Sequence, residues 1–188
     1  GSGARSSSRR TARSPGRRPG VRGVSRGFLA CLDRREPHAT PDLAEAAAAI
    51  GSAEVIPDPD LLVRRHTPEE QIPSLSWSAA ETAGTAATKL ESVRQARRWM
   101  RYYGPPNSIA WCSYYQALDP ASRLPPGFFE GKLVLIGLSL QTAPTVEGGG
   151  ADGFSTPWTT RTGRLTSGVE IHATVVDNLL NHTYVTTL

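Results

Sequence analysis

Cysteine is scarce in this chain, with only Cys31 and Cys112 among its 188 residues. Two cysteines are too few for a disulfide scaffold, which needs several bridges to stabilise a small secreted domain. Cys31 borders a tail without apolar periodicity, so we expect two free thiols, although one bridge stays open. The hydrophobic fraction of 38 % and the aromatic fraction of 7 % are modest, and the length suits one domain plus a tail.

Long apolar runs and catalytic signatures are also missing. No run of eighteen apolar residues occurs, so no segment is long enough to cross a bilayer as a helix. The chain has neither a G-x-S-x-G nucleophile elbow nor a glycine-rich phosphate-binding pattern. Three glycines in a row at 148–150 indicate a flexible loop instead. The missing nucleophile elbow argues against an acyl-transfer enzyme, and the missing phosphate-binding pattern argues against a nucleotide-binding protein.

Positive charge is confined to the N-terminal tail. Residues 1–35 hold ten arginines and one acid, a balance of +9, whereas residues 36–188 hold eleven basic and sixteen acidic residues, a balance of −5. The mildly acidic domain therefore argues against nucleic acid as a partner. We expect residues 1–38, rich in Arg and Ser, to be a disordered basic tail, with an anion-binding arm as the less favoured alternative. The ordered domain is expected over residues 39–188.

The first half of the domain predicts short elements. Thr40 and Pro41 are typical of a helix start, and Gly51 would end that helix. The next elements expected are a hairpin of strands at 53–56 and 61–65, a helix at 74–83 ended by Gly84, and a short helix at 113–118. The stretch 88–103 stays open, because its start favours a helix and its end favours a strand.

The C-terminal part predicts the centre of the fold. Lys132–Gly137 is apolar on both faces, which is typical of a strand buried in a sheet between helices. A long Gly-rich loop at 138–167 follows, and loops of that length are often functional. Residues 168–182 have helical periodicity with one apolar and one polar face. Together these features predict an α/β fold with a mixed sheet, a buried central strand and flanking helices.

Asp152, Glu170, His172 and Asp177 form the candidate constellation for a divalent cation. The helical periodicity separates His172 from the two acids on the same helix. Glu170 and Asp177 lie two turns apart, about 10 Å along the axis, which is too far for one ion. A cation at Asp152 and Glu170 stays open, but we predict no metal and no cofactor. For His172 a core position is favoured over ligand sensing.

Three ordered segments resemble one known family. They are FFEGKLVLIG (128–137), DGFSTPW (152–158) and SGVEIHATVVDNLLNHTYV (167–185). They are similar to segments of the second-type CHASE domains, the extracellular sensory domains associated with cyclases and histidine kinases. Weaker similarities extend the resemblance over 42–188. The family's N-terminal strand and helix are not visible, so residues 39–188 resemble a partial domain.

The resemblance implies a sensory module rather than an enzyme. It would lie on the extracytoplasmic side of the bacterial inner or plasma membrane, periplasmic or at the cell surface. Its parent would be a transmembrane receptor with an adenylate cyclase, two-component histidine kinase or Ser/Thr kinase output, anchored by helices that follow near Leu188. A homodimer is expected, and the signal would be an unidentified small molecule or environmental stimulus.

Five residues are the candidate ligand-binding residues of that module, and no catalytic residue is predicted. They are Asp152, Thr156, Glu170, His172 and Asp177. Two alternative hypotheses for the function, from other classes of protein, stay open at this point. One is a metal-assisted hydrolase of α/β fold, and the other is a dimerisation spacer that senses nothing.

Overall fold

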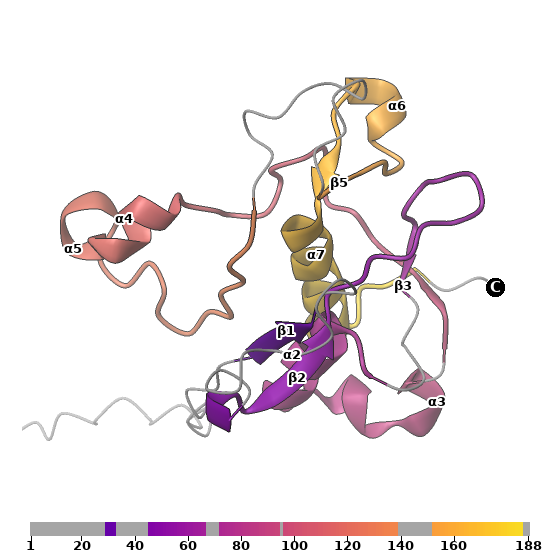
Figure 1. Ribbon diagram of the computed structural model, residues 1–188, viewed down its shortest axis with the longest axis horizontal. Coiled ribbons are helices and arrows are strands. Elements are labelled where there is room, and N and C mark those ends of the chain that lie inside the picture. The colour runs from indigo at the N-terminus through magenta and orange to yellow at the C-terminus, as the bar shows by residue number, and fades with distance from the viewer. Residues whose placement is uncertain (1–28, 33–44, 67–71, 95, 139–151, 186–188) are drawn as a thin grey trace, which may run out of the picture.

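The structure is a computed structural model, and it describes residues 29–32, 45–66, 72–94, 96–138 and 152–185; of residues 29–32 it describes the backbone alone. The chain contains both helices and short strands, interspersed along its length (Figure 1). The expectation of a mixed α/β fold is therefore confirmed. Among the described residues, no helix is both long and apolar enough to cross a membrane.

The strands form three separate two-stranded sheets. In chain order, β1 (Leu29–Leu32) pairs in parallel with β2 (Ala49–Ser52), β3 (Arg65–His66) pairs antiparallel with β4 (Arg98–Trp99), and β5 (Gly153–Phe154) pairs antiparallel with β6 (Thr166–Ser167). Isolated β-bridges connect these sheets to other segments. Examples are the bridges between Leu62 and Ser155 and between Trp99 and Val185. Short ribbons joined by bridges leave most of the core to the helices.

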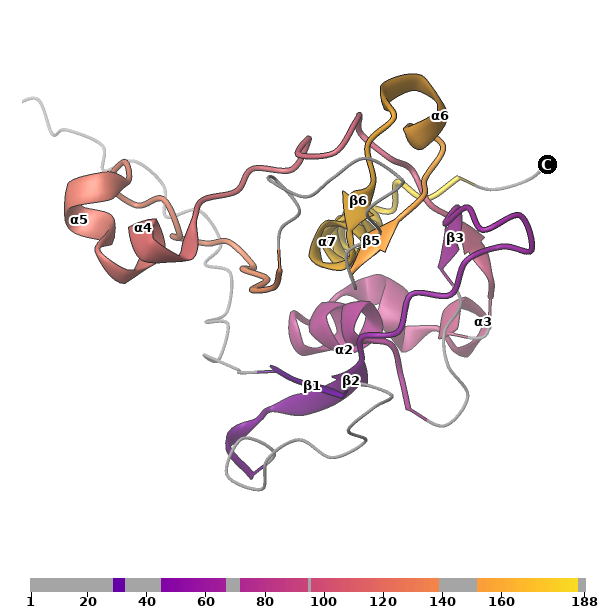
Figure 2. The same cartoon turned by 45° about the horizontal axis from the view of Figure 1, so that its top comes forward.

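Two helices lie at the centre of the molecule, α2 (Leu75–Thr82) and α7 (Gly168–Asn181). Both views show them packed together, with β1 and β2 on the other side of α2 (Figure 2). The smaller helices are η1 (Ala86–Lys89), α3 (Glu91–Arg94), α4 (Tyr114–Leu118), α5 (Pro120–Arg123) and α6 (Thr159–Thr162). The buried apolar cluster consists of Val63, Trp77, Ala80, Met100, Ile171, Val175 and Leu179. Most of this core therefore comes from α2 and α7.

The ends of both central helices follow local sequence signals. Ser74 precedes α2, and its hydroxyl accepts the backbone N–H of Trp77 at 3.2 Å, as an N-cap residue does. Gly84 then takes a φ of +76°, which a glycine adopts without steric cost. Helix α7 ends at His182, which has a φ of +53°. The helices predicted at 74–83, 113–118 and 168–182 are therefore confirmed within two residues.

The predictions before α2 are wrong in detail. Residues 49–52 form β2 instead of the end of a helix, and residues 53–56 form no strand. A Cβ on Gly51 would lie 2.6 Å from Leu75 Cα, so β2 approaches the backbone of α2 closely. Pairing with β1 therefore outweighs the helical preference of the alanines. Strand β1 itself lies in the stretch expected to be a disordered tail, whose other residues lie outside the described ones.

The predicted buried central strand at 132–137 is not found. Residues 132–138 pair with no strand among the described residues, and Ile136 is 79 % exposed. Leu133, Val134 and Leu138 are exposed too. Leu135 is half-buried, and Gly137 approaches α7 closely, since a Cβ there would lie 2.7 Å from Val169 Cβ. An apolar run acquires a buried position only where a sheet exists to receive it, and the described strands provide none there.

The predicted loop at 138–167 contains structure of its own. Its second part holds β5, α6 and β6, while residues 139–151, which include the three glycines, lie outside the described residues. The ambiguous stretch 88–103 resolves into the end of η1, then α3 and β4. Cys112 is a free thiol, as expected, and the side chain of Cys31 is not among those described.

Candidate functional site

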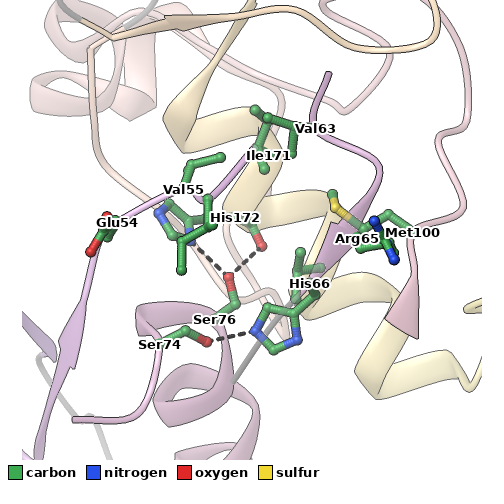
Figure 3. Close-up of a pocket in the computed structure, with 12 residues that line it drawn as sticks. Glu54, Val55, Val63, Arg65, His66, Ser74, Ser76, Met100, Ile171 and His172 are labelled. Atoms are coloured by element: carbon green, nitrogen blue, oxygen red, sulfur yellow. Dashed lines mark hydrogen bonds between the residues drawn. The ribbon is translucent and has the colours of Figure 1, made fainter. Parts of the chain in front are cut away.

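A polar cavity of the core lies where β3, α2 and α7 meet, and two histidines from distant parts of the chain line it. Its volume is about 20 Å³, which is room for about one or two water molecules. Its polar lining includes His66 of β3, Ser74 and Ser76 around the start of α2, and His172 of α7 (Figure 3). Helix α7 also contributes Ile171 and Val175, so one helix provides both a polar and an apolar wall.

His172 is fully bonded inside this core. Its Nε2 atom lies 3.1 Å from the carbonyl oxygen of Ala53, and its Nδ1 atom lies 2.8 Å from Ser76 Oγ. A carbonyl only accepts, so Nε2 carries the proton and Nδ1 accepts the serine hydroxyl. Burial lowers the pKa of His172, which keeps the ring neutral. The favoured expectation of a bonded core histidine agrees with this geometry.

His66 is the more perturbed of the two histidines. Its Nε2 atom lies 2.7 Å from Ser74 Oγ, the hydroxyl that also caps α2 (Figure 3). Burial lowers the pKa of His66 to about 4, and the positive charge of Arg98 and the neighbouring His172 act in the same direction. The ring is therefore neutral at physiological pH, and it links β3 to the first turn of α2.

Two serine–histidine pairs resemble part of a hydrolytic triad, but their geometry does not support catalysis. Ser76 is fully buried, and Ser74 is 4 % exposed, so neither hydroxyl can reach a substrate. In a hydrolytic triad a carboxylate orients the histidine, whereas His172 is held by the backbone carbonyl of Ala53. Both pairs join β3, α2 and α7 as core hydrogen bonds.

A carboxylate surrounded by arginines stabilises the turn before β3. The side chain of Asp58 is 2 % exposed, and it pairs with Arg64, Arg65 and Arg97 at 3.3, 2.6 and 2.9 Å. The hydrogen bond from Arg65 is the largest influence that lowers the pKa of Asp58, so the carboxylate stays charged. This network fixes β3 against the segment before β4.

Two of the predicted ligand residues hold α7 to the segment 101–108. Both carboxylate oxygens of Glu170 accept backbone N–H groups, from Asn107 at 2.9 Å and from Ser108 at 3.0 Å. Asp177, two turns along the same helix, accepts the hydroxyl of Tyr103. We call these bonds the α7 clamp. Both acids are therefore occupied by protein groups.

The other two predicted residues sit before α7. The carbonyl of Asp152 accepts the N–H of Gly168, the first residue of α7, and a Cβ on Gly168 would lie 2.3 Å from the Asp152 carboxylate. Burial raises the pKa of Asp152. Thr156 is fully buried, with its hydroxyl 3.3 Å from that of Thr166. Three of the five residues thus belong to α7, Asp152 contacts its first residue, and Thr156 contacts Thr166 of β6 just before the helix. Only His172 lines the cavity.

A common metal site for these residues does not form. Within the described ranges, no three His, Cys, Asp or Glu side chains come together in a way that could hold an ion. The sequence analysis did not identify the cavity residues His66, Ser74 and Ser76 as candidate ligand residues. Their grouping depends on contacts such as Ser76 with His172, which are 96 positions apart. No short motif indicates such a contact.

The comparisons with known proteins give one match. The family model for the CHASE2 domain matches residues 7–188, which is nearly the whole chain. No curated protein and no solved structure matches this chain. CHASE2 domains are non-catalytic, extracellular sensory domains of signalling proteins. The extent of the match, together with the segments at 128–137 and 167–185, identifies the chain as a member of the CHASE2 domain family.

Proposed function

We propose that this chain is the signal-input domain of a bacterial transmembrane receptor whose output is an adenylate cyclase, a histidine kinase or a Ser/Thr kinase. The family match is the observation that carries this proposal. The domain would act on the periplasmic or cell-surface side of the membrane, as a homodimer anchored through helices of the parent protein. Its input would be a small molecule or an environmental stimulus.

The position of α7 supports a mechanism for this input. The helix lines the histidine cavity with Ile171, His172 and Val175, and its other residues carry the α7 clamp. Its buried Asn178 also accepts the backbone N–H of Arg101 at 2.7 Å and donates to the Arg101 carbonyl. One rigid element therefore contacts the cavity, the segment 101–108 and, through Gly168, Asp152. A displacement of α7 would therefore change its contacts with the cavity, with segment 101–108 and with Asp152.

The signal would act by a population shift between two arrangements of α7. A ligand that binds one arrangement more tightly favours it, and the strength of the response is limited by that difference in affinity. The residues we propose to respond are Asp152, Thr156, Glu170, His172 and Asp177. The last three belong to α7, Asp152 contacts its first residue, and Thr156 contacts Thr166 directly before it. In this mechanism Glu170 and Asp177 act by releasing or keeping the α7 clamp.

Substitution of the residues that hold the first turn of α7 tests this function in the full-length parent. Asp152→Ala removes the carboxylate that lies against Gly168, and Glu170→Ala removes the two bonds to segment 101–108, so we expect the output activity in membrane vesicles to change at least twofold. Glu81→Ala, on the exposed side of α2, is the matched control and should leave the output unchanged. Unchanged output in both Asp152→Ala and Glu170→Ala would refute the mechanism.

A further inference from the structure

A second, smaller cavity adjoins the histidine cavity, and one wall of it carries a buried positive charge. Its volume is about 10 Å³, the space of about one water molecule. The two cavities share His66, Met100 and Val175. The remaining lining residues of the second cavity are Arg98, Trp99, Asn178, Leu179 and Tyr184. Its walls are thus mainly apolar, with Arg98 as the only charged group.

Arg98 differs from Arg64, Arg65 and Arg97 because it has no acidic partner in the part of the chain that the structure describes. It is 8 % exposed, and its Nη2 atom donates to the carbonyl of Val93. Its Nη1 atom is buried and has no hydrogen-bond partner. Arg64, Arg65 and Arg97 all pair with Asp58, whereas no described acid forms an ion pair with Arg98. Among the described residues, no carboxylate therefore compensates the buried positive charge of Arg98.

The groups around Arg98 offset only part of its burial: burial lowers the pKa of the guanidinium, and the Tyr184 side chain acts in the opposite direction. The guanidinium carbon lies 5.1 Å from the centre of the Tyr184 ring, a cation–π contact that offsets a small part of the burial cost. The amide of Asn178 is committed to Arg101 and Tyr103. Two other buried polar atoms lack partners, Trp77 Nε1 and Thr85 Oγ1, but both belong to neutral groups. Arg98 is the one buried cation among the described unpartnered groups.

A buried cation of this kind favours a bound anion. An unpaired charge in a low-dielectric interior is unfavourable, because the hydration that stabilised it in water is lost and no opposite charge replaces it. An anion supplies the missing opposite charge and an acceptor for a buried N–H group. No acid is among the described residues that line the cavity, so the charge of Arg98 would repel a cation there, and the apolar walls suit a weakly hydrated ion.

We infer that this cavity is a binding site for a small monovalent anion of halide size, held by the Arg98 guanidinium beside Met100 and Leu179. The small volume sets the size of the ion, because a larger carboxylate would need the walls to move apart. The site stands on its own geometry. Only the use of the anion as a signal rests on the proposed sensory function.

Thermal unfolding of the 188-residue chain tests the site. Sodium chloride replaces sodium gluconate at constant ionic strength, so that only the specific ion changes. We expect Tm to rise with chloride in the native chain, since a ligand that binds only the folded state stabilises it. Arg98→Met should abolish that rise, and Arg101→Met, on an exposed neighbouring arginine, should keep it. No chloride-specific rise, or an equal rise in Arg98→Met, would overturn the inference.

A direct measurement on the unmodified chain covers the case in which Arg98→Met does not fold. Crystals soaked in sodium bromide should show an anomalous peak beside Arg98, among Met100, Leu179 and Tyr184. Peaks confined to surface arginines would overturn the site. Neither experiment depends on the receptor output, so a failed anion site and a failed sensory function are told apart.

Discussion

At the scale of single residues, the neutral histidines of the cavity make stability depend on pH. The pKa of His66 is about 4 in the folded chain, against an ordinary value of 6.5. Between these values the unfolded chain binds a proton that the folded chain does not, so stability is lost as pH falls from 6.5 toward 4. His172, whose pKa burial also lowers, acts in the same direction.

His66→Gln tests this dependence, because it removes the titrating group of the ring that contacts Ser74. We expect the free energy of unfolding to fall less steeply between pH 7 and pH 5 than in the native chain. The difference should approach about 1.4 kcal/mol per pH unit at the steepest point. Urea unfolding at several pH values measures it, with His182→Asn at the exposed end of α7 as control. A slope equal to that of the native chain would contradict the assignment.

Asp58 provides a second prediction at this scale. Asp58→Asn keeps the shape of the side chain but leaves the hydrogen bonds of Arg64, Arg65 and Arg97 without their charged acceptor, so we expect a loss of about 1–3 kcal/mol in unfolding free energy. Asp60→Asn is the control, since its side chain is 52 % exposed and should lose less than about 1 kcal/mol. Equal losses would show that burial of Asp58 is unimportant.

At the scale of elements, local signals account for the central helices and fail for the strands. Helix α2 was predictable because Ser74 and Gly84 mark its ends, and α7 because its apolar positions recur at helical spacing. The strands are two to four residues long, too short for a period of two to be recognised. Their positions depend on distant partners such as β1 for β2, which no local pattern encodes.

The same limit applies to the candidate site. The core role of His172 was predictable from its place among apolar residues of α7. The pairing of Ser76 with His172 and the burial of Arg98 depend on contacts between separate elements. Glu170 and Asp177 were correctly separated from His172 on the helix. The groups that they hold, Asn107 and Tyr103, follow only from the packing of α7 on segment 101–108.

The apolar run at 132–138 gives a prediction that separates its sequence pattern from its structure. Ile136 is 79 % exposed, so Ile136→Ala should change the unfolding free energy by less than about 0.5 kcal/mol. Ile171, in α7, is 2 % exposed, and Ile171→Ala should cost about 2–5 kcal/mol. Chemical unfolding of both variants makes the comparison. A comparable loss in Ile136→Ala would restore the buried strand that the sequence pattern predicts.

At the scale of the whole molecule, α7 connects the parts that a sensor needs to couple. It lines the histidine cavity, contacts the second cavity beside Arg98 through Val175, Asn178 and Leu179, and holds segment 101–108 through the α7 clamp. In the mechanism that we propose, a change in either cavity displaces this helix. This coupling is the central claim, and it predicts that the α7 clamp sets the output of the receptor.

The most direct test replaces the Glu170 contact of the α7 clamp by a covalent link in the full-length parent. Ser108→Cys and Glu170→Cys, in a background with Cys31→Ser and Cys112→Ser, are joined by a short bismaleimide, and the output activity is measured in membrane vesicles. Before linking, the output should differ at least twofold from the native receptor, because the Glu170 contact is lost. Linking should return it toward the native level, while each single-cysteine variant stays unaffected by the reagent. Identical output before and after linking would contradict the claim that α7 carries the signal.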